Sequence, residues 1–180
     1  GIWSPVEPGH GNMFQTDGVS NSLSKMFGPE LSFADKMIQS GDKVAIIKYS
    51  FGGTALHPGA GYGDWYPDQK RRNHFDNALA TINNAFQVAD INRDGRLDKL
   101  IPYGIIWMQG ESDAEHSIES SDAYFENLSN LMIYLRAALR NEKLPVIIGK
   151  INDSHMTLDG KPTQPFIESV HLAQKEFTDQ

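Results

Sequence analysis

Three short runs of consecutive apolar residues, separated by stretches with helical periodicity, constrain the fold of this chain more than any other feature. The runs lie at 43–49, 103–107 and 144–149. Continuous apolar runs of this length predict strands that are buried on both faces. Parallel strands need long crossover connections, which are usually helical. The pattern therefore predicts the α/β class, as a three-layer sandwich with helices on both faces of a parallel sheet.

Four stretches predict the helices that would flank this sheet. Residues 74–89 carry the apolar stripe of an amphipathic helix, formed by Phe75, Leu79, Ile82 and Phe86. Further helices are expected at 32–39, 125–139 and 165–177. Residues 1–30 are rich in Gly, Pro, Asn and Ser and are expected to form surface loops.

Length and composition indicate one folded domain over residues 1–180, because 39 % of the residues are hydrophobic and 22 % are charged. The net charge of −7 argues against nucleic acid and against an anionic membrane surface as partners. The chain has no cysteine, which excludes disulfides, thiolate nucleophiles and zinc–thiolate sites. No apolar segment predicts a membrane span or a signal peptide, so the compartment stays open, with a secreted or periplasmic location slightly favoured.

The segments that follow the three predicted strands are the first places to look for a site, because ligands of open parallel sheets bind beyond the carboxyl ends of the strands. Gln109 follows the second strand, and its side-chain NH2 can donate two hydrogen bonds without carrying charge. Gly52 and Gly53 follow the first strand, where the absence of Cβ lets a backbone N–H approach a ligand. Two such donors at neighbouring strand ends would form an oxyanion hole.

A purely structural interpretation of the same residues stays open. Glu111 and Asp113 would be favourable at the start of a helix because of its dipole. Gln109 could then be solvated, and the glycine pair could form an ordinary turn.

Four blocks of the sequence resemble the sialate O-acetylesterase-like (SASA) family of carbohydrate acetylesterases, within the SGNH hydrolases. The most specific is WMQGESDA at 107–114, which is similar to the W-x-Q-G-E-S-D-A block of that family. The others are GPELSFA at 28–34, IKYSFGGTAL at 47–56 and SVHLAQ at 169–174. Together they cover about residues 27–176. The resemblance implies an SGNH fold, which is flavodoxin-like.

The resemblance also assigns site residues. It implies that Gly53 is the backbone oxyanion donor, that Gln109 is the side-chain donor, and that Glu111 supports the site by hydrogen bonding. The family carries its nucleophile in a G-Q-S-N-M block and its base in an Asp-x-x-His block, and this sequence contains neither. The catalytic domain therefore looks incomplete at both ends, and residues 1–180 alone are expected to be nearly inert. Gly18–Asn21, and Asp153 with His155, are weaker substitutes for the missing blocks.

The expected function is a serine esterase that removes O-acetyl groups from carbohydrate through an acyl-enzyme, with no cofactor for catalysis. Sialic acid, xylan and other acetylated glycans remain open as substrates. Trp65 and Tyr66, with Tyr62, are candidates for stacking on sugar rings. The alternative is a non-catalytic carbohydrate-binding or interaction module on the same frame, which the same aromatic residues would serve.

A separate pattern at 90–98 resembles the first nine positions of an EF-hand loop. Oxygen ligands would come from the side chains of Asp90, Asn92, Asp94 and Asp98 and from the backbone carbonyl of Arg96. The twelfth position is Ile101, so the usual bidentate Glu is missing. A structural Ca²⁺ is therefore one interpretation, and a polar turn is the other. A metal-dependent hydrolase is a weaker alternative, because this loop precedes a predicted strand and would lie at the rim opposite the crevice.

Overall fold

The computed structural model describes residues 3–16, 19–41, 43–68, 70–152, 157 and 159–180. The chain divides into two compact units. The first comprises residues 1–52 and 80–101, and the second comprises residues 53–79 and 102–180. The expectation of a single domain stays a prediction.

The first unit contains a short hairpin and a helix. Strands β1 (Gln15–Thr16) and β2 (Asn21–Ser22) pair antiparallel within the region predicted as surface loop. Helix α1 (Glu30–Gln39) follows, two residues longer at its start than predicted. An ion pair between Lys48 Nζ and Glu30 Oε1, 2.9 Å apart, joins the helix start to the 43–52 segment. Glu30 Oε1 also accepts a hydrogen bond from the Gly28 amide at 3.0 Å.

The strand predicted at 43–49 is absent from the described residues, where this segment has no strand assignment and belongs to no ladder. Its residues are half-buried or exposed, so the burial expected of a central strand is not seen either. A strand also needs a neighbour that supplies backbone hydrogen bonds along its length. Helix α2 (His74–Phe86) runs from the second unit into the first and confirms the helix predicted at 74–89.

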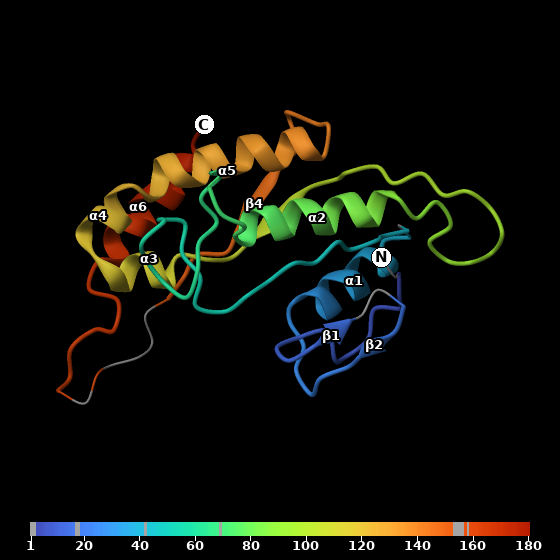
Figure 1. Ribbon diagram of the computed structural model, residues 1–180, viewed down its shortest axis with the longest axis horizontal. Coiled ribbons are helices and arrows are strands. Elements are labelled where there is room, and N and C mark those ends of the chain that lie inside the picture. The colour runs from blue at the N-terminus through green and yellow to red at the C-terminus, as the bar shows by residue number, and fades with distance from the viewer. Residues whose placement is uncertain (1–2, 17–18, 42, 69, 153–156, 158) are drawn as a thin grey trace. The chain divides into compact units, whose positions relative to one another are not determined.

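The second unit contains a parallel pair of strands with helices packed nearby (Figure 1). Strand β3 (Ile105–Trp107) pairs with β4 (Val146–Ile148), with Ile106 opposite Ile147. Both strands lie inside predicted runs and are parallel, as predicted. The described sheet has two strands, so the structure shows helices with a small parallel sheet and not the full three-layer sandwich.

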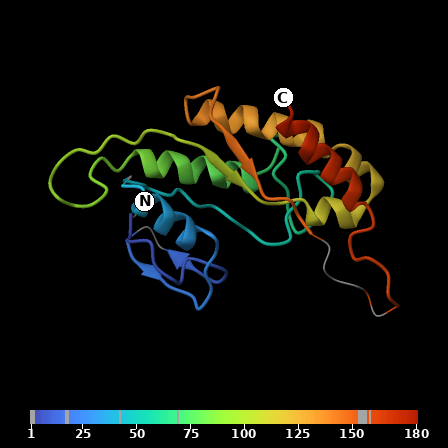
Figure 2. The ribbon, with the colours of Figure 1, turned by 180° about the vertical axis from the view of Figure 1, so that it is seen from behind.

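Four helices complete the second unit: α3 (Glu111–His116), α4 (Ile118–Asp122), α5 (Tyr124–Ala138) and α6 (Ile167–Thr178). Helix α6 packs against α3, α4 and α5, as the view from behind in Figure 2 also shows. The inward side chains of these helices and of β3 form the core, which includes Trp107, Tyr124, Leu128, Leu131, Met132 and Val170. This core fixes the carboxyl end of β3, where Gln109 lies.

Candidate active site

Gln109 is the centre of the site, and both its side chain and its backbone are fixed. Its Nε2 donates to the Thr54 carbonyl at 2.9 Å and to Asp113 Oδ2 at 2.7 Å. Its backbone carbonyl accepts from the Tyr124 hydroxyl at 2.7 Å and from Gln174 Nε2 at 3.2 Å. The two acceptors on Nε2 determine which way the amide is turned, because the reversed amide would place Oε1 against two oxygens. Gln109 is therefore held in one orientation.

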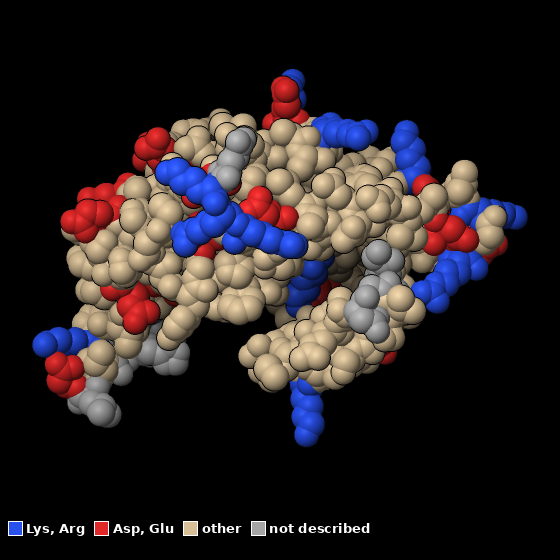
Figure 3. All heavy atoms as spheres, in the orientation of Figure 1, with Lys and Arg blue, Asp and Glu red and all other residues tan. Residues whose placement is uncertain are grey.

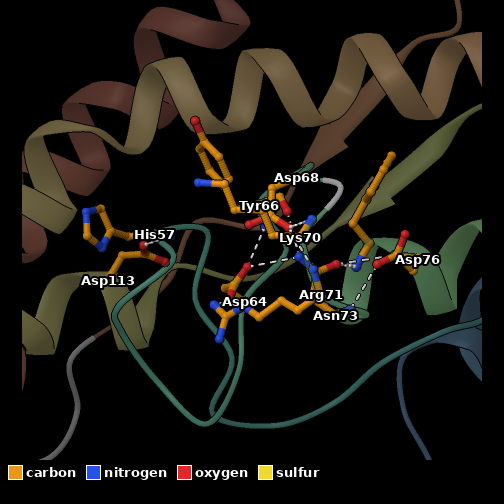
Figure 4. A network of polar contacts seen from close by, with 10 residues as sticks. His57, Asp64, Tyr66, Asp68, Lys70, Arg71, Asn73, Asp76 and Asp113 are labelled. Carbon is orange, nitrogen blue, oxygen red and sulfur yellow. Dashed lines mark hydrogen bonds and ion pairs between the residues drawn. The ribbon is translucent and has the colours of Figure 1, made fainter.

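Asp113 connects Gln109 to the loop that follows Gly53. Its carboxylate accepts hydrogen bonds from the backbone amides of Leu56 and His57, both at 2.9 Å, as well as from Gln109. The side chain is fully buried. Burial raises the pKa of the Asp113 carboxyl, and the hydrogen bonds from Gln109, Leu56 and His57 lower it in part. Figure 4 shows the carboxylate beside His57.

Local backbone geometry brings Asp113 to this position. Gly110 precedes α3 with φ of 146°, a conformation that L side chains rarely adopt. A Cβ at Gly110 would lie 2.9 Å from Val170 Cγ1, so the chain passes close to α6 here. Helix α3 then begins at once and presents Asp113, its third residue, toward Gln109.

Gly53, the expected backbone donor, lies next to Thr54 and therefore beside Gln109. It is exposed, and its N–H donates to no described residue. Its carbonyl accepts from the Tyr62 amide at 2.7 Å. A Cβ at Gly53 would lie 2.7 Å from Tyr62 Cδ2, and its φ is 73°. The position therefore requires glycine. The two expected oxyanion donors, Gly53 and Gln109, lie near each other, because Gln109 donates to the carbonyl of the residue that follows Gly53.

Glu111 lies at the start of α3 with its side chain exposed, and it forms no hydrogen bond or ion pair with a described residue. The carboxylate that contacts Gln109 is that of Asp113, which sequence reasoning considered only as a helix-start residue. Gln109 lies before the first residue of α3, so the four-residue spacing of helical neighbours could not have indicated this contact. The supporting hydrogen bond expected from Glu111 stays a prediction.

Trp65 lies in the core of the second unit. It is 5 % exposed, its Nε1 donates to Thr54 Oγ1 at 2.9 Å, and its ring contacts Trp107 edge-on with centroids 5.0 Å apart. Its rings are covered by protein and are not available for stacking on a sugar. The structure therefore corrects the prediction that Trp65 stacks on a sugar ring. Tyr66 is half-buried, and Tyr62 is 87 % exposed beside Gly53.

A cleft of about 240 Å³ opens beside Tyr62, a site that the sequence did not indicate. Asp64, 2 % exposed, anchors the loop that lines it. Its carboxylate pairs with Arg71 and accepts from Asn73 Nδ2 at 3.1 Å and from the Tyr66 amide at 3.0 Å, as Figure 4 shows. His74 also lines the cleft, and burial lowers its pKa while the Asp64 charge raises it in part.

The loop at 90–98 is closed by hydrogen bonds from its own backbone amides. Asp90 accepts from the Asp94 and Gly95 amides, at 3.1 and 2.9 Å, and Asp98 accepts from the Ile91 amide at 2.8 Å. The other expected ligands are Asn92, whose Oδ1 accepts from the Asp94 amide, and the carbonyl of Arg96. Among the described residues, no three His, Asp or Glu side chains gather around one metal position. The calcium prediction therefore depends on the sequence pattern.

The two segments considered as substitutes for the missing nucleophile and base blocks lie partly or wholly outside the described residues. Gly18 precedes Ser20 and Asn21 and is not described, and neither Asp153 nor His155 is described. Along the part of the chain that the structure describes, no helix is both long and apolar enough to cross a membrane.

A parallel strand pair with fixed polar donors beyond its carboxyl end is typical of a ligand site in α/β proteins. Residues 6–180 match the SASA family, described as carbohydrate esterase, sialic acid-specific acetylesterase. Neither the curated proteins nor the solved structures include a match to this chain. Because the match covers almost all of the sequence, the chain belongs to the SASA family of carbohydrate esterases. Its function class is that of the carbohydrate acetylesterases, and its substrate class is acetylated carbohydrate.

Proposed function

We propose that this chain supplies the oxyanion-stabilising part of a serine esterase that removes O-acetyl groups from a glycan. The observation that supports the proposal most is the corner formed by Gly53, Gln109 and Asp113. The Gly53 N–H donates to no described residue, and the Gln109 amide, just beyond the carboxyl end of β3, is fixed by two acceptors. Donors held in place before the reaction stabilise developing charge without a cost of reorganisation.

The two N–H groups of Gln109 have different tasks in this proposal. The N–H that donates to the Asp113 carboxylate keeps the Gln109 amide in its orientation. The other N–H donates to the Thr54 carbonyl, and it is the one that would donate to an oxyanion instead, since Thr54 follows Gly53 directly. The Gly53 N–H would provide the second donor.

The reaction would proceed by acyl transfer. A serine hydroxyl, with its proton removed by histidine, attacks the acetyl carbonyl and forms a tetrahedral oxyanion. The C–O bond to the sugar then breaks, the sugar oxygen receives the proton from histidine, and an acetyl-serine remains. Water then attacks the acetyl-serine with the same histidine as base, and acetate leaves. The serine and the histidine are not assigned within these 180 residues, and the resemblance places them in other blocks of the family.

The test uses the natural protein. Gln109→Ala is expected to lower kcat for an aryl acetate by about 100-fold to 1,000-fold with little change in KM, because an oxyanion donor acts mainly in the transition state. The matched control is Gln87→Ala, which removes an exposed glutamine in the first unit and should leave kcat unchanged. Equal kcat for Gln109→Ala and wild type would contradict the proposal.

A serine-reactive fluorophosphonate separates the esterase from the binding module. Labelling of the natural protein, blocked by an excess of acetyl ester, is expected for the esterase. A protein that binds acetylated glycan but is never labelled would support the non-catalytic module instead.

A further inference from the structure

We infer that Gln174 is a positioning residue for the oxyanion donor Gln109, and that it acts together with Tyr124 by holding the Gln109 backbone carbonyl. The hydrogen bonds of both residues go to the backbone of Gln109, whereas its side-chain amide donates to Thr54 and Asp113. The effect on catalysis rests on the proposed function of Gln109. The contacts themselves can be tested without any catalytic activity.

The turn that follows Gln109 needs outside contacts to keep one conformation. Gly110 has a φ of 146°, and glycine can adopt several other backbone conformations at little cost. A Cβ at Gly110 would lie 2.9 Å from Val170 Cγ1 and 3.4 Å from the Tyr124 hydroxyl. A displacement of this turn would move Gln109 as well, because the two residues share a rigid peptide bond. The side chains around the turn therefore determine where Gln109 lies.

Two donors meet at the Gln109 carbonyl oxygen. The Tyr124 hydroxyl donates to this oxygen at 2.7 Å, and Gln174 Nε2 donates to it at 3.2 Å. Gln174 Nε2 also donates to the Tyr124 oxygen, at 3.4 Å. A carbonyl oxygen has two lone pairs, so it can accept both hydrogen bonds at once. Any movement of the carbonyl away from this cluster would stretch two hydrogen bonds together.

Burial strengthens the hydrogen bonds of this cluster. Tyr124 is 0 % exposed, Gln174 is 4 % exposed and Gln109 is 7 % exposed. The three side chains are neutral, whereas many charged side chains stand out on the surface that Figure 3 shows. Burial raises the pKa of the Tyr124 hydroxyl, so this group stays protonated and can donate at neutral pH. Hydrogen bonds away from water are electrostatically stronger, and a lost partner costs more.

Helix α6 supplies Gln174 from the sequence block at 169–174. Val170 and Gln174 are four residues apart, so they lie on the same face of the helix. Val170 packs at Gly110, and Gln174 bonds to the carbonyl that precedes it. This block resembles a block of the family but contains neither of the proposed oxyanion donors. One face of α6 that holds the turn gives the block a role.

The first experiment measures hydrolysis of an aryl acetate by the natural protein. Gln174→Met keeps a similar side-chain volume but removes the donor, and it is expected to lower kcat about 3-fold to 10-fold with little change in KM. Tyr124→Phe removes the other donor and should have an effect of similar size. The control is Leu135→Ala, about three turns along α5 from Tyr124. It leaves a cavity in the core and lowers stability, but kcat of the folded protein should not change.

A double variant distinguishes positioning from a purely structural role. If Gln174 acts through Gln109, then Gln174→Met should change kcat by less than about twofold when residue 109 is already alanine. A general loss of structure would instead lower kcat by the same factor in both backgrounds, and that result would overturn the proposal. Wild-type kcat in both Gln174→Met and Tyr124→Phe would overturn it as well.

NMR of the Gln109 side chain tests the contacts without catalysis. The natural protein is labelled with 15N in its glutamine side chains, and the pair of signals that Gln109→Ala removes identifies the Gln109 NH2 group. Gln174→Met is expected to shift this pair, and Leu135→Ala is expected to leave it in place. An unshifted pair in Gln174→Met would overturn the positioning role. Wild-type kcat in Gln109→Ala would contradict the esterase proposal instead, so the two failures can be distinguished.

Discussion

Asp113 Oδ2 accepts a hydrogen bond of 2.7 Å from Gln109 Nε2, and both side chains are buried. The same carboxylate accepts from the backbone amides of Leu56 and His57. One side chain therefore joins the end of β3 to the loop that begins at Gly53. A buried carboxylate is tolerated because several donors surround it. The geometry of the proposed oxyanion corner depends on Asp113.

Asp113→Asn is expected to destabilise the second unit. Whichever way the new amide is turned, its NH2 faces N–H donors, so at least one buried donor loses its acceptor. We expect a loss of about 1–3 kcal/mol in the free energy of unfolding, measured in urea. The matched control is Asp122→Asn at the exposed end of α4, where no change is expected. Equal stability of the two variants would show that the carboxylate is not needed here.

Gly53→Ala is expected to cost stability and to move Tyr62. The left-handed φ of 73° disfavours a side chain by about 1–2 kcal/mol, and the new methyl group would lie 2.7 Å from the Tyr62 ring. Urea unfolding measures the first effect, and the aromatic signals of Tyr62 in NMR measure the second. Gly52→Ala is the control, because a Cβ at Gly52 meets nothing within 4 Å. A Gly53→Ala protein with wild-type stability and an unmoved Tyr62 would contradict this geometry.

Helices that bury one face were predictable from the sequence. The stripes of α2 and α5 reflect packing along a whole helix, and both helices were found within a few residues of their predicted ends. A helix beginning at Glu111 was offered only as the purely structural interpretation, and α4 was missed, because six and five residues are too few to show a period. Helix α4 is instead fixed by a local device, a capping box between Ser117 and Ser120.

Non-local contacts limited the other predictions. The apolar run at 43–49 indicated a strand, but apolar composition does not reveal a hydrogen-bonding partner. Gln109 donates to the carbonyl of the residue that follows Gly53, and the roles of Gln109 and Gly53 as oxyanion donors stay predictions. The contact of Asp113 with Gln109 depends on the loop at 54–57, which is distant in the sequence. The sequence also could not distinguish a buried Trp65 from an exposed Tyr62.

His74 is expected to make the stability of the second unit depend on pH. Burial lowers the pKa of the folded-state imidazole below its usual 6.5, and Asp64 raises it in part. The unfolded chain therefore binds a proton at a higher pH than the folded chain does. The contribution of neutral His74 to the free energy of unfolding is complete above pH 6.5. It is lost as the pH falls through the pKa that His74 has in the folded protein.

The measurement is urea unfolding at pH 7.5 and at a series of lower pH values. His74→Gln should lose less stability between these values than wild type, whereas His116→Gln, at the exposed end of α3, should follow wild type. The comparison uses the slope with pH, because His74→Gln also removes the packing of the imidazole on Trp65. Parallel slopes for wild type and His74→Gln would contradict the prediction.

The loop at 90–98 gives a prediction on calcium. Asp90, Asn92, Asp94 and Asp98 have the spacing of an EF-hand loop, and a cation that binds only the folded state raises the melting temperature. We expect added Ca²⁺ to raise the midpoint by a few degrees relative to chelator, on the order of 1 kcal/mol of binding free energy at the concentrations used. Asp94→Asn removes one charge but keeps an oxygen for the Arg96 amide, so its midpoint should respond less to Ca²⁺ than that of wild type. Asp122→Asn should respond as wild type does. Identical wild-type midpoints with Ca²⁺ and with chelator would leave the loop as a polar turn closed by its own amides, which is the state that the hydrogen bonds of Asp90 and Asp98 already describe.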